Sequence, residues 1–217
     1  MKILEIEIHL ISNYRYKNMG QQSSYQLIWY DTETTGLNVW TDKITELAAI
    51  SDDSDATFQK LIKIGEPLSD FIVNFTGITD KMLEQKGVLP REAFETFYQY
   101  LLSFNTQVVL IAHNGDNYDK LILNSSYRRV IGDNAPYLSS YYIHHFDTMR
   151  MAKFLHPGLK SYSLKNLCKN FGIENPNHHR ALNDAIVCKR LFDHMFNESK
   201  YMDFRDLYKD IYGICTF

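Results

Sequence analysis

The sequence predicts an α/β fold in which a mixed central β-sheet, begun by a three-strand meander, is flanked by helices. Strand-like segments come first, at residues 26–31, 44–51 and 57–64, and turns containing Gly or Asp separate them. A nearly continuous apolar run at 108–112 is typical of a buried central strand, and a further strand is expected at 141–146. Because helical patterns alternate with these later strands, the order of elements favours a mixed sheet covered by helices.

Helices are expected between and after the later strands. A helix beginning at Pro90 would place Phe94, Phe97, Tyr98 and Leu101 on one face, and proline suits a first helical turn. These side chains are therefore predicted to lie in the core. The other expected helices cover residues 79–85, 118–125, 148–155, 163–171 and 180–196, with one more within 201–217.

Residues 1–24 are expected to form an N-terminal extension, and residues 25–217 the main domain. Residues 4–10 alternate between apolar and polar side chains, which predicts a half-buried strand, and the polar stretch 12–24 is typical of a connector. A main domain of this length is long enough to bury a sizeable core.

The charge distribution limits the classes of function. A formal net charge of -3 argues against a protein that coats duplex DNA through bulk electrostatics. Residues 31–57 contain seven acidic residues and one lysine, whereas residues 149–190 contain eight basic and two acidic residues. An acidic centre beside a basic flank suits a metal site supplied with a phosphate backbone, and the alternative is a pair of solvated helix faces.

The cysteines and the hydropathy pattern indicate the compartment. Cys168, Cys188 and Cys215 form neither a C-x-x-C pair nor a zinc-ligand spacing, which favours reduced thiols. The sequence has neither an uninterrupted apolar stretch of about 18 residues nor a secretory signal. The protein is therefore expected to be soluble and intracellular, in the cytoplasm or nucleus, without a membrane partner.

Asp31 and Glu33 lie at the end of the first strand of the meander, in the stretch Asp-Thr-Glu-Thr-Thr-Gly-Leu at 31–37. Side chains at i and i+2 of a strand point to the same face, so the two carboxylates should converge. Like charges side by side are unfavourable unless a cation lies between them, and carboxylate oxygens suit Mg²⁺ or Mn²⁺. Taken alone, such a pair also fits a solvated turn.

Two more acids lie on the apolar sides of expected helices. Asp119 is in phase with Ile122, and Asp184 is in phase with Cys188 and Leu191. A charge that points into a core needs a partner. The alternative is a carboxylate that merely benefits from the dipole at a helix N-terminus.

His179 directly precedes the helix that carries Asp184. Its ordinary pKa near 6.5 suits a general base close to neutral pH, although a lone histidine here also fits a surface or capping role. Asp31, Glu33, Asp119, Asp184 and His179 are the candidate catalytic residues, and the four acids are the candidate metal ligands.

With these residues in place, the sequence resembles the DEDDh exonucleases of the DnaQ-like, ribonuclease H-like superfamily. The resemblance runs from about Tyr25 to Met195. Its first motif is 31–37, its second ends at Asp119, and its third is His179 with four residues before Asp184.

Parts of the motifs resemble different branches of the superfamily. Residues 112–119 and 161–164 are most similar to the three-prime repair exonucleases, the TREX type. Residues 181–183 in the third motif are more similar to bacterial and viral proofreading subunits.

The resemblance implies a 3′→5′ exonuclease that hydrolyses terminal phosphodiester bonds of DNA, on single strands or frayed 3′ ends. The four acids would hold two Mg²⁺ ions, for which Mn²⁺ can substitute, and His179 would deprotonate the attacking water. The products would be nucleoside 5′-monophosphates.

The resemblance also implies a set of substrate-binding residues. Leu37 would wedge beside the terminal base, Phe75 and Tyr118 would line the end of the strand, and Asn114 would help to order the second motif. Thr34 belongs to the same set. Further candidates for contacts with the nucleic-acid backbone are Lys160, Lys165 and Arg180.

Two other functions are open from the sequence. An exoribonuclease that trims RNA 3′ ends would use the same motifs, because the choice between DNA and RNA depends on the surroundings of the 2′-hydroxyl. A non-catalytic nucleic-acid-binding module could share the fold, but all five candidate catalytic residues are present. The oligomeric state, a homodimer included, is left open.

Overall fold

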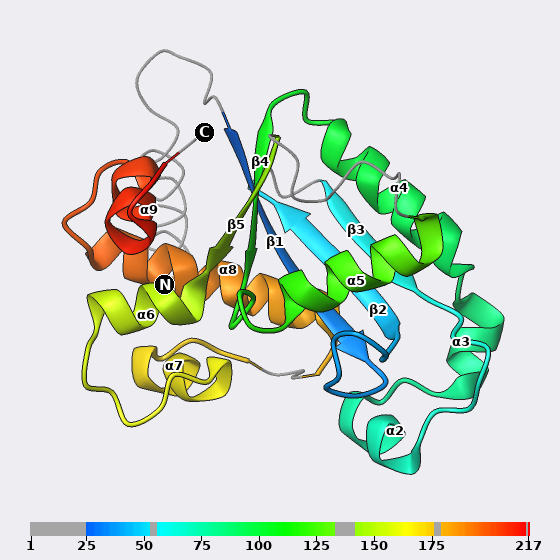
Figure 1. The fold of residues 1–217 in the computed structure, drawn as a ribbon. Helices are drawn as coiled ribbons and strands as arrows, with labels where there is room; N and C mark the ends of the chain where they lie inside the picture. Colours follow the sequence, from blue (N-terminus) through cyan, green and yellow to red (C-terminus); the bar gives the residue numbers. More distant parts are fainter. Residues whose placement is uncertain (1–24, 53–55, 133–141, 176–178, 216) are drawn as a thin grey trace.

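The computed structural model describes residues 25–52, 56–132, 142–175, 179–215 and 217. Within them, a five-stranded sheet has the order β3-β2-β1-β4-β5 (Figure 1). β1 pairs antiparallel with β2, and β2 with β3, which confirms the predicted meander. β4 pairs parallel with β1 and with β5, so the sheet is mixed. The strands are β1 (Tyr25–Thr34), β2 (Ile44–Ser51), β3 (Thr57–Leu61), β4 (Gln107–Ala112) and β5 (Ile143–Asp147).

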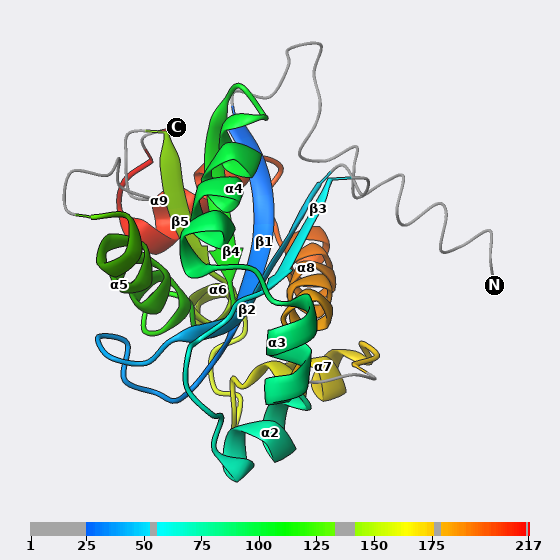
Figure 2. The same ribbon diagram turned by 90° about the vertical axis from the view of Figure 1, so that its right-hand side faces the viewer.

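Helices cover both faces of this sheet, with α5 on one side and α8 on the other (Figure 2). Alternating side chains of β1 explain the two layers, because Trp29 packs in one core and Tyr30 in the other. Trp29 lies with the apolar sides of α6 to α9, and Tyr30 lies with those of α4 and α5. The helices are α2 (Asp70–Thr76), α3 (Asp80–Lys86), α4 (Pro90–Leu102), α5 (Asp119–Ile131), α6 (Thr148–Leu155), α7 (Leu164–Phe171), α8 (Ala181–Glu198) and α9 (Phe204–Tyr212).

The expected helix at Pro90 is confirmed. Phe94, Phe97 and Leu101 are buried, and Tyr98 packs against the same core from a half-buried position. This part of the pattern was predictable because the helix is long enough for its apolar period to repeat.

Helix α2 was not expected from the sequence. Its apolar residues lie on both its buried and its exposed sides, so no single apolar face marks it, but its ends carry recognisable signals. The Ser69 hydroxyl accepts a hydrogen bond from the N–H of Ile72, and Gly77 ends the helix in the left-handed conformation, with φ 71°. Ile72 joins a small third core with α3.

Several predicted boundaries differ from those observed. The third strand ends at Leu61, and Ile62 after it donates a last hydrogen bond to the Thr45 carbonyl oxygen of β2 and forms an isolated bridge with Val88. Helix α5 continues beyond 125 to Ile131, and Gly132 at φ 111° follows it. The strand expected at 4–10 lies outside the described residues. Among those that are described, no helix combines the length and the apolar character needed to cross a bilayer.

Candidate metal and catalytic site

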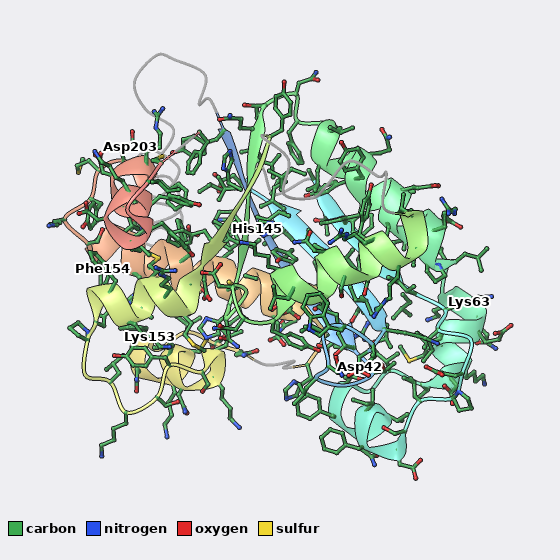
Figure 3. The ribbon with its side chains drawn as sticks, viewed as in Figure 1. Asp42, Lys63, His145, Lys153, Phe154 and Asp203 are labelled. Atoms are coloured by element: carbon green, nitrogen blue, oxygen red, sulfur yellow. The ribbon has the colours of Figure 1, made fainter. Side chains whose placement is uncertain are left out.

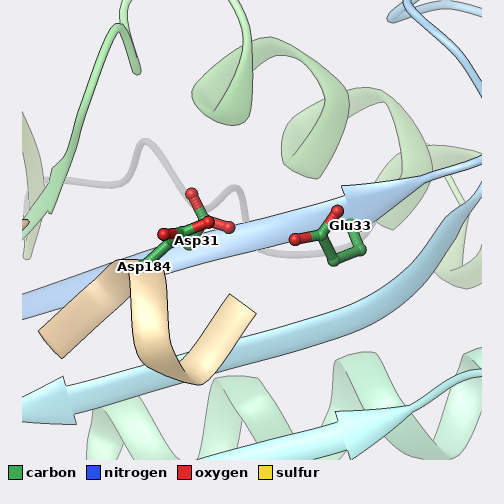
Figure 4. Close-up of side chains that lie close together, drawn as sticks. All are labelled: Asp31, Glu33 and Asp184. Carbon is green, nitrogen blue, oxygen red and sulfur yellow. The ribbon is translucent and has the colours of Figure 1, made fainter. Parts of the chain in front are cut away.

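Three carboxylates meet beside the end of β1 and the start of α8. Asp31 and Glu33 come from β1, and Asp184 comes from the first turn of α8. Each side chain contributes one carboxylate oxygen to a group of three that all lie within 4.8 Å of one another (Figure 4). Glu33 and Asp184 are buried, and Asp31 is half-buried. The convergence predicted for Asp31 and Glu33 is therefore observed, and Asp184 joins them.

The electrostatics of this group favour protonation or a bound cation. Burial raises the pKa of Asp31 well above its usual value, and the charges of Asp119, Glu33 and Asp184 raise it further. Burial, followed by the charge of Asp184, raises the pKa of Glu33 to about 8. A divalent cation would stabilise the ionised forms, so metal and protons should compete for the same oxygens.

Asp119 lies next to this group but outside the set of three. It begins α5, on the opposite helical layer from Asp184, and its Oδ1 accepts a hydrogen bond of 2.8 Å from the hydroxyl of Thr32. Thr32 stands between Asp31 and Glu33 in β1, so its side chain points to the other face of the strand. Burial raises the pKa of Asp119 to about 7, although the hydrogen bond from Thr32 opposes this rise.

His179 lies directly before α8, close to the carboxylates. The backbone N–H of His179 donates a hydrogen bond of 3.0 Å to Oδ2 of Asp184. Its backbone has φ 69°, in the left-handed region that few residues other than glycine adopt. Its imidazole packs against the ring of Phe75, with ring centroids 3.7 Å apart and planes tilted by 37°. The residue therefore connects the carboxylate group to an exposed aromatic side chain.

The proposed strand-binding residues surround the same end of β1. The hydroxyls of Thr34 and Tyr118 lie 2.5 Å apart, and both lie within hydrogen-bonding reach of the Gly36 carbonyl oxygen, at 2.8 and 2.6 Å. Leu37 is 87% exposed and Phe75 is 47% exposed. Large apolar side chains with this much exposure are available to contact a ligand.

The loop that carries Leu37 is held from two sides. Asp42 accepts a hydrogen bond of 2.7 Å from the N–H of Asn38, and a Cβ at Gly36 would approach its Oδ2 to 2.5 Å. This close approach explains the glycine of the first motif. Arg129 of α5 donates a hydrogen bond of 2.6 Å to the carbonyl oxygen of Asp42.

The loop of the second motif is shaped by Asp147, which also caps α6. Asp147 accepts hydrogen bonds from the N–H groups of Asn114, at 2.9 Å, and Asp116, at 3.3 Å. Asn114 has φ 63°, and its side-chain oxygen accepts a hydrogen bond of 3.0 Å from Asn117. These contacts are consistent with a role for Asn114 in ordering the loop.

His113, the first residue of that loop after β4, is a structural histidine. Its Nδ1 lies 2.9 Å from the Thr148 hydroxyl, and its Nε2 lies 2.8 Å from the Tyr162 carbonyl oxygen. Burial lowers the pKa of His113 to about 4. The ring is therefore neutral near pH 7 and links β4 to α6 and to the segment before α7.

Helix α9, whose role the sequence left open, also supports the second motif. The Tyr212 hydroxyl donates to Oδ2 of Asp116 at 3.0 Å and accepts from the N–H of Asp147 at 3.0 Å. The guanidinium of Arg150 lies 4.4 Å from the centre of the Tyr212 ring. The C-terminal helix is thereby bonded to the loop that leads to Asp119.

The sequence analysis named Arg180 as a candidate for contacts with the nucleic-acid backbone. In the structure its guanidinium is instead paired with a carboxylate. Its Nε and Nη2 donate to the carboxylate of Glu46, at 3.1 and 2.9 Å. Glu46 also accepts from Gln59 at 2.7 Å and from the N–H of Ala181 at 3.2 Å. Sequence reasoning missed this pair, although Arg180 stands within the third motif. Lys160 and Lys165, the other two candidates, are exposed.

The residues present suit a divalent metal ion. Three buried or half-buried carboxylates offer only oxygen ligands, and oxygen-rich acidic sites favour hard cations such as Mg²⁺ and Mn²⁺. Asp119 stands close enough to raise the pKa of Asp31, so a fourth carboxylate borders the group. Asp119 and Asp184 both lie in first helical turns, where the helix dipole favours their negative charges.

Solved structures with similar folds support this architecture. Exonuclease I of E. coli, solved in complex with an oligonucleotide, superposes with a TM-score of 0.72 at 21% identity, over 85% of this chain and 43% of that chain. Exonuclease I from Methylocaldum szegediense superposes with a TM-score of 0.67 at 20% identity, over 82% of this chain and 41% of that chain. These similarities support the fold.

Sequence comparison then defines the family. The profile of the family described as Exonuclease, of the RNase T type, matches residues 28–192, and this chain belongs to that family. The DNA polymerase III PolC-type of Halalkalibacterium halodurans is 32% identical over 190 residues, which cover 85% of this chain and 12% of that protein. The corresponding protein of Listeria welshimeri is 32% identical over 225 residues, covering 97% and 14%.

The chain thus spans about an eighth of the length of these relatives. The predicted membership in the DEDD exonuclease superfamily is confirmed. Both relatives are PolC-type DNA polymerases by name. The similarity of residues 181–183 to proofreading subunits stays a prediction, as does the similarity of the second motif to the TREX type.

Proposed function

We propose that this chain is a metal-dependent 3′→5′ exonuclease that shortens single DNA strands or frayed 3′ ends and releases nucleoside 5′-monophosphates. One observation carries the proposal: Asp31, Glu33 and Asp184 converge within 4.8 Å in a member of the exonuclease family. Buried like charges are costly to fold, so their assembly calls for a cationic ligand.

The four acids have distinct places in this proposal. Asp31, Glu33 and Asp184 would form the shared ligand set, and Asp119 would complete it from the side of α5. Two Mg²⁺ ions, or Mn²⁺ in their place, would lower the pKa of the attacking water and stabilise negative charge on the leaving 3′ oxygen. Thr32 would hold Asp119 in position through the hydrogen bond already described.

His179 would accept the proton of the attacking water at an imidazole nitrogen. The hydrogen bond from its own N–H to Asp184 supports this role, because it fixes the residue beside a metal ligand. A side chain with an ordinary pKa near neutrality can both take and release a proton at physiological pH.

Four residues would position the strand. Leu37 and Phe75 would contact bases through exposed apolar surface, and Thr34 and Tyr118 would line the strand end through their paired hydroxyls. Asn114 would act indirectly, by ordering the loop before Asp119. Stacking and apolar contacts tolerate any base, so little sequence preference is expected.

DNA is the favoured substrate because the polymerase relatives act on DNA by name. The test is a time course on single strands labelled at either end, as DNA and as RNA, with Mg²⁺ or with EDTA. Stepwise loss of the 3′ label from DNA, with monophosphate products and no reaction in EDTA, is the expected result. Faster shortening of RNA would identify an exoribonuclease. Binding without shortening, in either nucleic acid, would identify a non-catalytic module and refute the proposal.

A further inference from the structure

We propose that Phe71 and Phe75 form a stacking platform for unpaired bases of the nucleic-acid strand that enters the site. The inference rests on the proposed function and extends the contact already assigned to Phe75 by a second ring, Phe71, which the sequence analysis did not single out. Phe71 is 71% exposed and Phe75 is 47% exposed. Their rings lie parallel to within 14°, with centroids 5.7 Å apart.

The two rings lie next to the proposed catalytic residue His179. Phe71 and Phe75 are separated by one turn of α2, so they lie on the same helix face. Phe75 contacts the imidazole of His179, and the N–H of His179 donates to Asp184. A line of three rings therefore runs from the surface of α2 to the imidazole of His179, the residue whose backbone N–H bonds to Asp184.

Packing of the core beneath α2 does not account for the exposed ring of Phe71. The core side of α2 is formed by Ile72 and Thr76, which are buried. Ile72 packs in the small core shared with α3, and the Thr76 hydroxyl donates to the Ile72 carbonyl oxygen at 2.9 Å. Phe71 contributes little to that core, because most of its surface faces solvent. Exposed aromatic surface beside a catalytic site is the feature expected of a ligand contact.

Nucleobases are the occupant that this geometry fits. A flat apolar ring stacks on either face of any base, and the contact does not depend on sequence. Unpaired bases can leave their neighbours to lie on the rings, whereas bases inside a duplex are already stacked on both faces. The platform therefore favours single-stranded or frayed 3′ ends over blunt duplex ends.

The test is equilibrium binding of a short single-stranded DNA oligomer in EDTA, where cleavage is blocked. One 2-aminopurine is placed at successive positions from the 3′ end, because its fluorescence falls when it stacks on an aromatic ring. Wild-type protein is expected to quench the probe at one or two positions near the end. Phe71→Ala is expected to remove part of this quenching and to weaken binding roughly 5- to 150-fold, the range of one base stack. Phe71→Trp, which keeps an aromatic ring at this position, should retain both the quenching and the affinity that Phe71→Ala loses.

The matched control is Phe154→Ala, a change of the same kind at a 45% exposed phenylalanine on α6. Figures 1 and 3 show this residue on the opposite side of the molecule from α2. It should alter neither quenching nor affinity. Thermal melts of all variants should agree within a few degrees, which excludes misfolding as the cause.

The outcomes separate the platform from the proposed function. Equal binding and equal quenching in Phe71→Ala and Phe154→Ala, or no quenching by wild-type protein, would overturn the platform even if the enzyme shortens DNA with Mg²⁺. Position-dependent quenching that needs Phe71, in a protein that shortens no strand with Mg²⁺, would support the platform and refute the exonuclease function.

Discussion

Glu33 and Glu46 face each other across β1 and β2, yet their surroundings are opposite. Glu46 is fully buried, and its pKa is lowered: burial alone would raise it, but hydrogen bonds from Arg180 and Gln59 outweigh that effect. Glu33 has Asp31 and Asp184 as near neighbours, and its pKa is raised to about 8.

The difference distinguishes a structural carboxylate from a ligand-binding one. Glu46 has the partners it needs within the chain, so its charge stabilises the contact between β2 and the start of α8. The group around Glu33 assembles like charges, which destabilise the fold until a cation binds. Two neighbouring residues contact the two carboxylate environments separately: Arg180 pairs with Glu46, and the backbone N–H of His179 donates to Asp184.

The largest effect is expected from neutralising a ligand. Asp31→Asn should lower the exonuclease rate by about 10³-fold or more, because the bound metal contributes several kcal/mol of transition-state stabilisation. The rate is measured on 3′-labelled single-stranded DNA. Glu46→Gln is the matched control, and it should keep most of the activity under conditions where it is folded. Equal loss in both variants would remove the distinction between the two environments.

His179→Ala should slow hydrolysis by about 10²- to 10⁴-fold, the usual contribution of a general base. The unfolding free energy should change little, since the N–H that bonds to Asp184 belongs to the backbone. The measurement is a pH-rate profile alongside a urea melt. A profile identical in shape to that of the wild type would exclude the assigned proton transfer.

Arg180→Ala, in contrast to His179→Ala, should mainly lower the free energy of unfolding. Removing the partner of a buried charge costs about 3–5 kcal/mol, and the half-exposed position of Arg180 favours the lower end, about 3 kcal/mol. Urea unfolding measures this loss. The double variant Arg180→Met with Glu46→Leu should recover much of the stability, and failure of both single and double changes to affect it would show that the pair is not structural.

Mg²⁺ should stabilise the wild-type fold. A ligand at about one hundred times its dissociation constant adds about 2.7 kcal/mol to the free energy of unfolding. Thermal melts with Mg²⁺ or EDTA should show the gain in the wild type and in Glu46→Gln, but little of it in Asp31→Asn. An equal gain in all three would place the bound ion elsewhere.

A pH dependence of the metal-free protein is also expected. A carboxyl group whose pKa is raised by folding binds protons more tightly in the folded state, so stability falls as pH rises. For Glu33 this window runs from its usual value of 4.5 to about 8. Glu46, with a lowered pKa, should instead lose its contribution below that usual value. Urea melts in EDTA at several pH values test both slopes, and Mg²⁺ should flatten the upper one. A stability that rises through the upper window would contradict the raised pKa.

The local pattern of the sequence predicted most of the fold because apolar periodicity acts over a few residues. The meander, helix α4 and the buried strand β4 all follow from such patterns. Helix α2 did not, because its apolar residues lie on both its buried and its exposed sides, and with it the sequence analysis missed Phe71. Only the capping residues Ser69 and Gly77 could have indicated it.

The candidate site was predictable in part. Alternation along a strand joins Asp31 to Glu33, and a carboxylate on an apolar stripe marks Asp184. The position of Asp119 was not predictable at this level. Its bond to Thr32 crosses from α5 to β1, and sequence alone does not show which face of the strand a helix will meet.

By itself, the sequence determined the family, the order of strands and helices, and the acids available for a metal site. Only the tertiary structure decided which acids are paired. Glu46 and Arg180 are 134 positions apart, and their contact depends on how α8 packs against β2. Side-chain charge is encoded residue by residue, but its compensation depends on distance and burial in three dimensions, and these are set by packing.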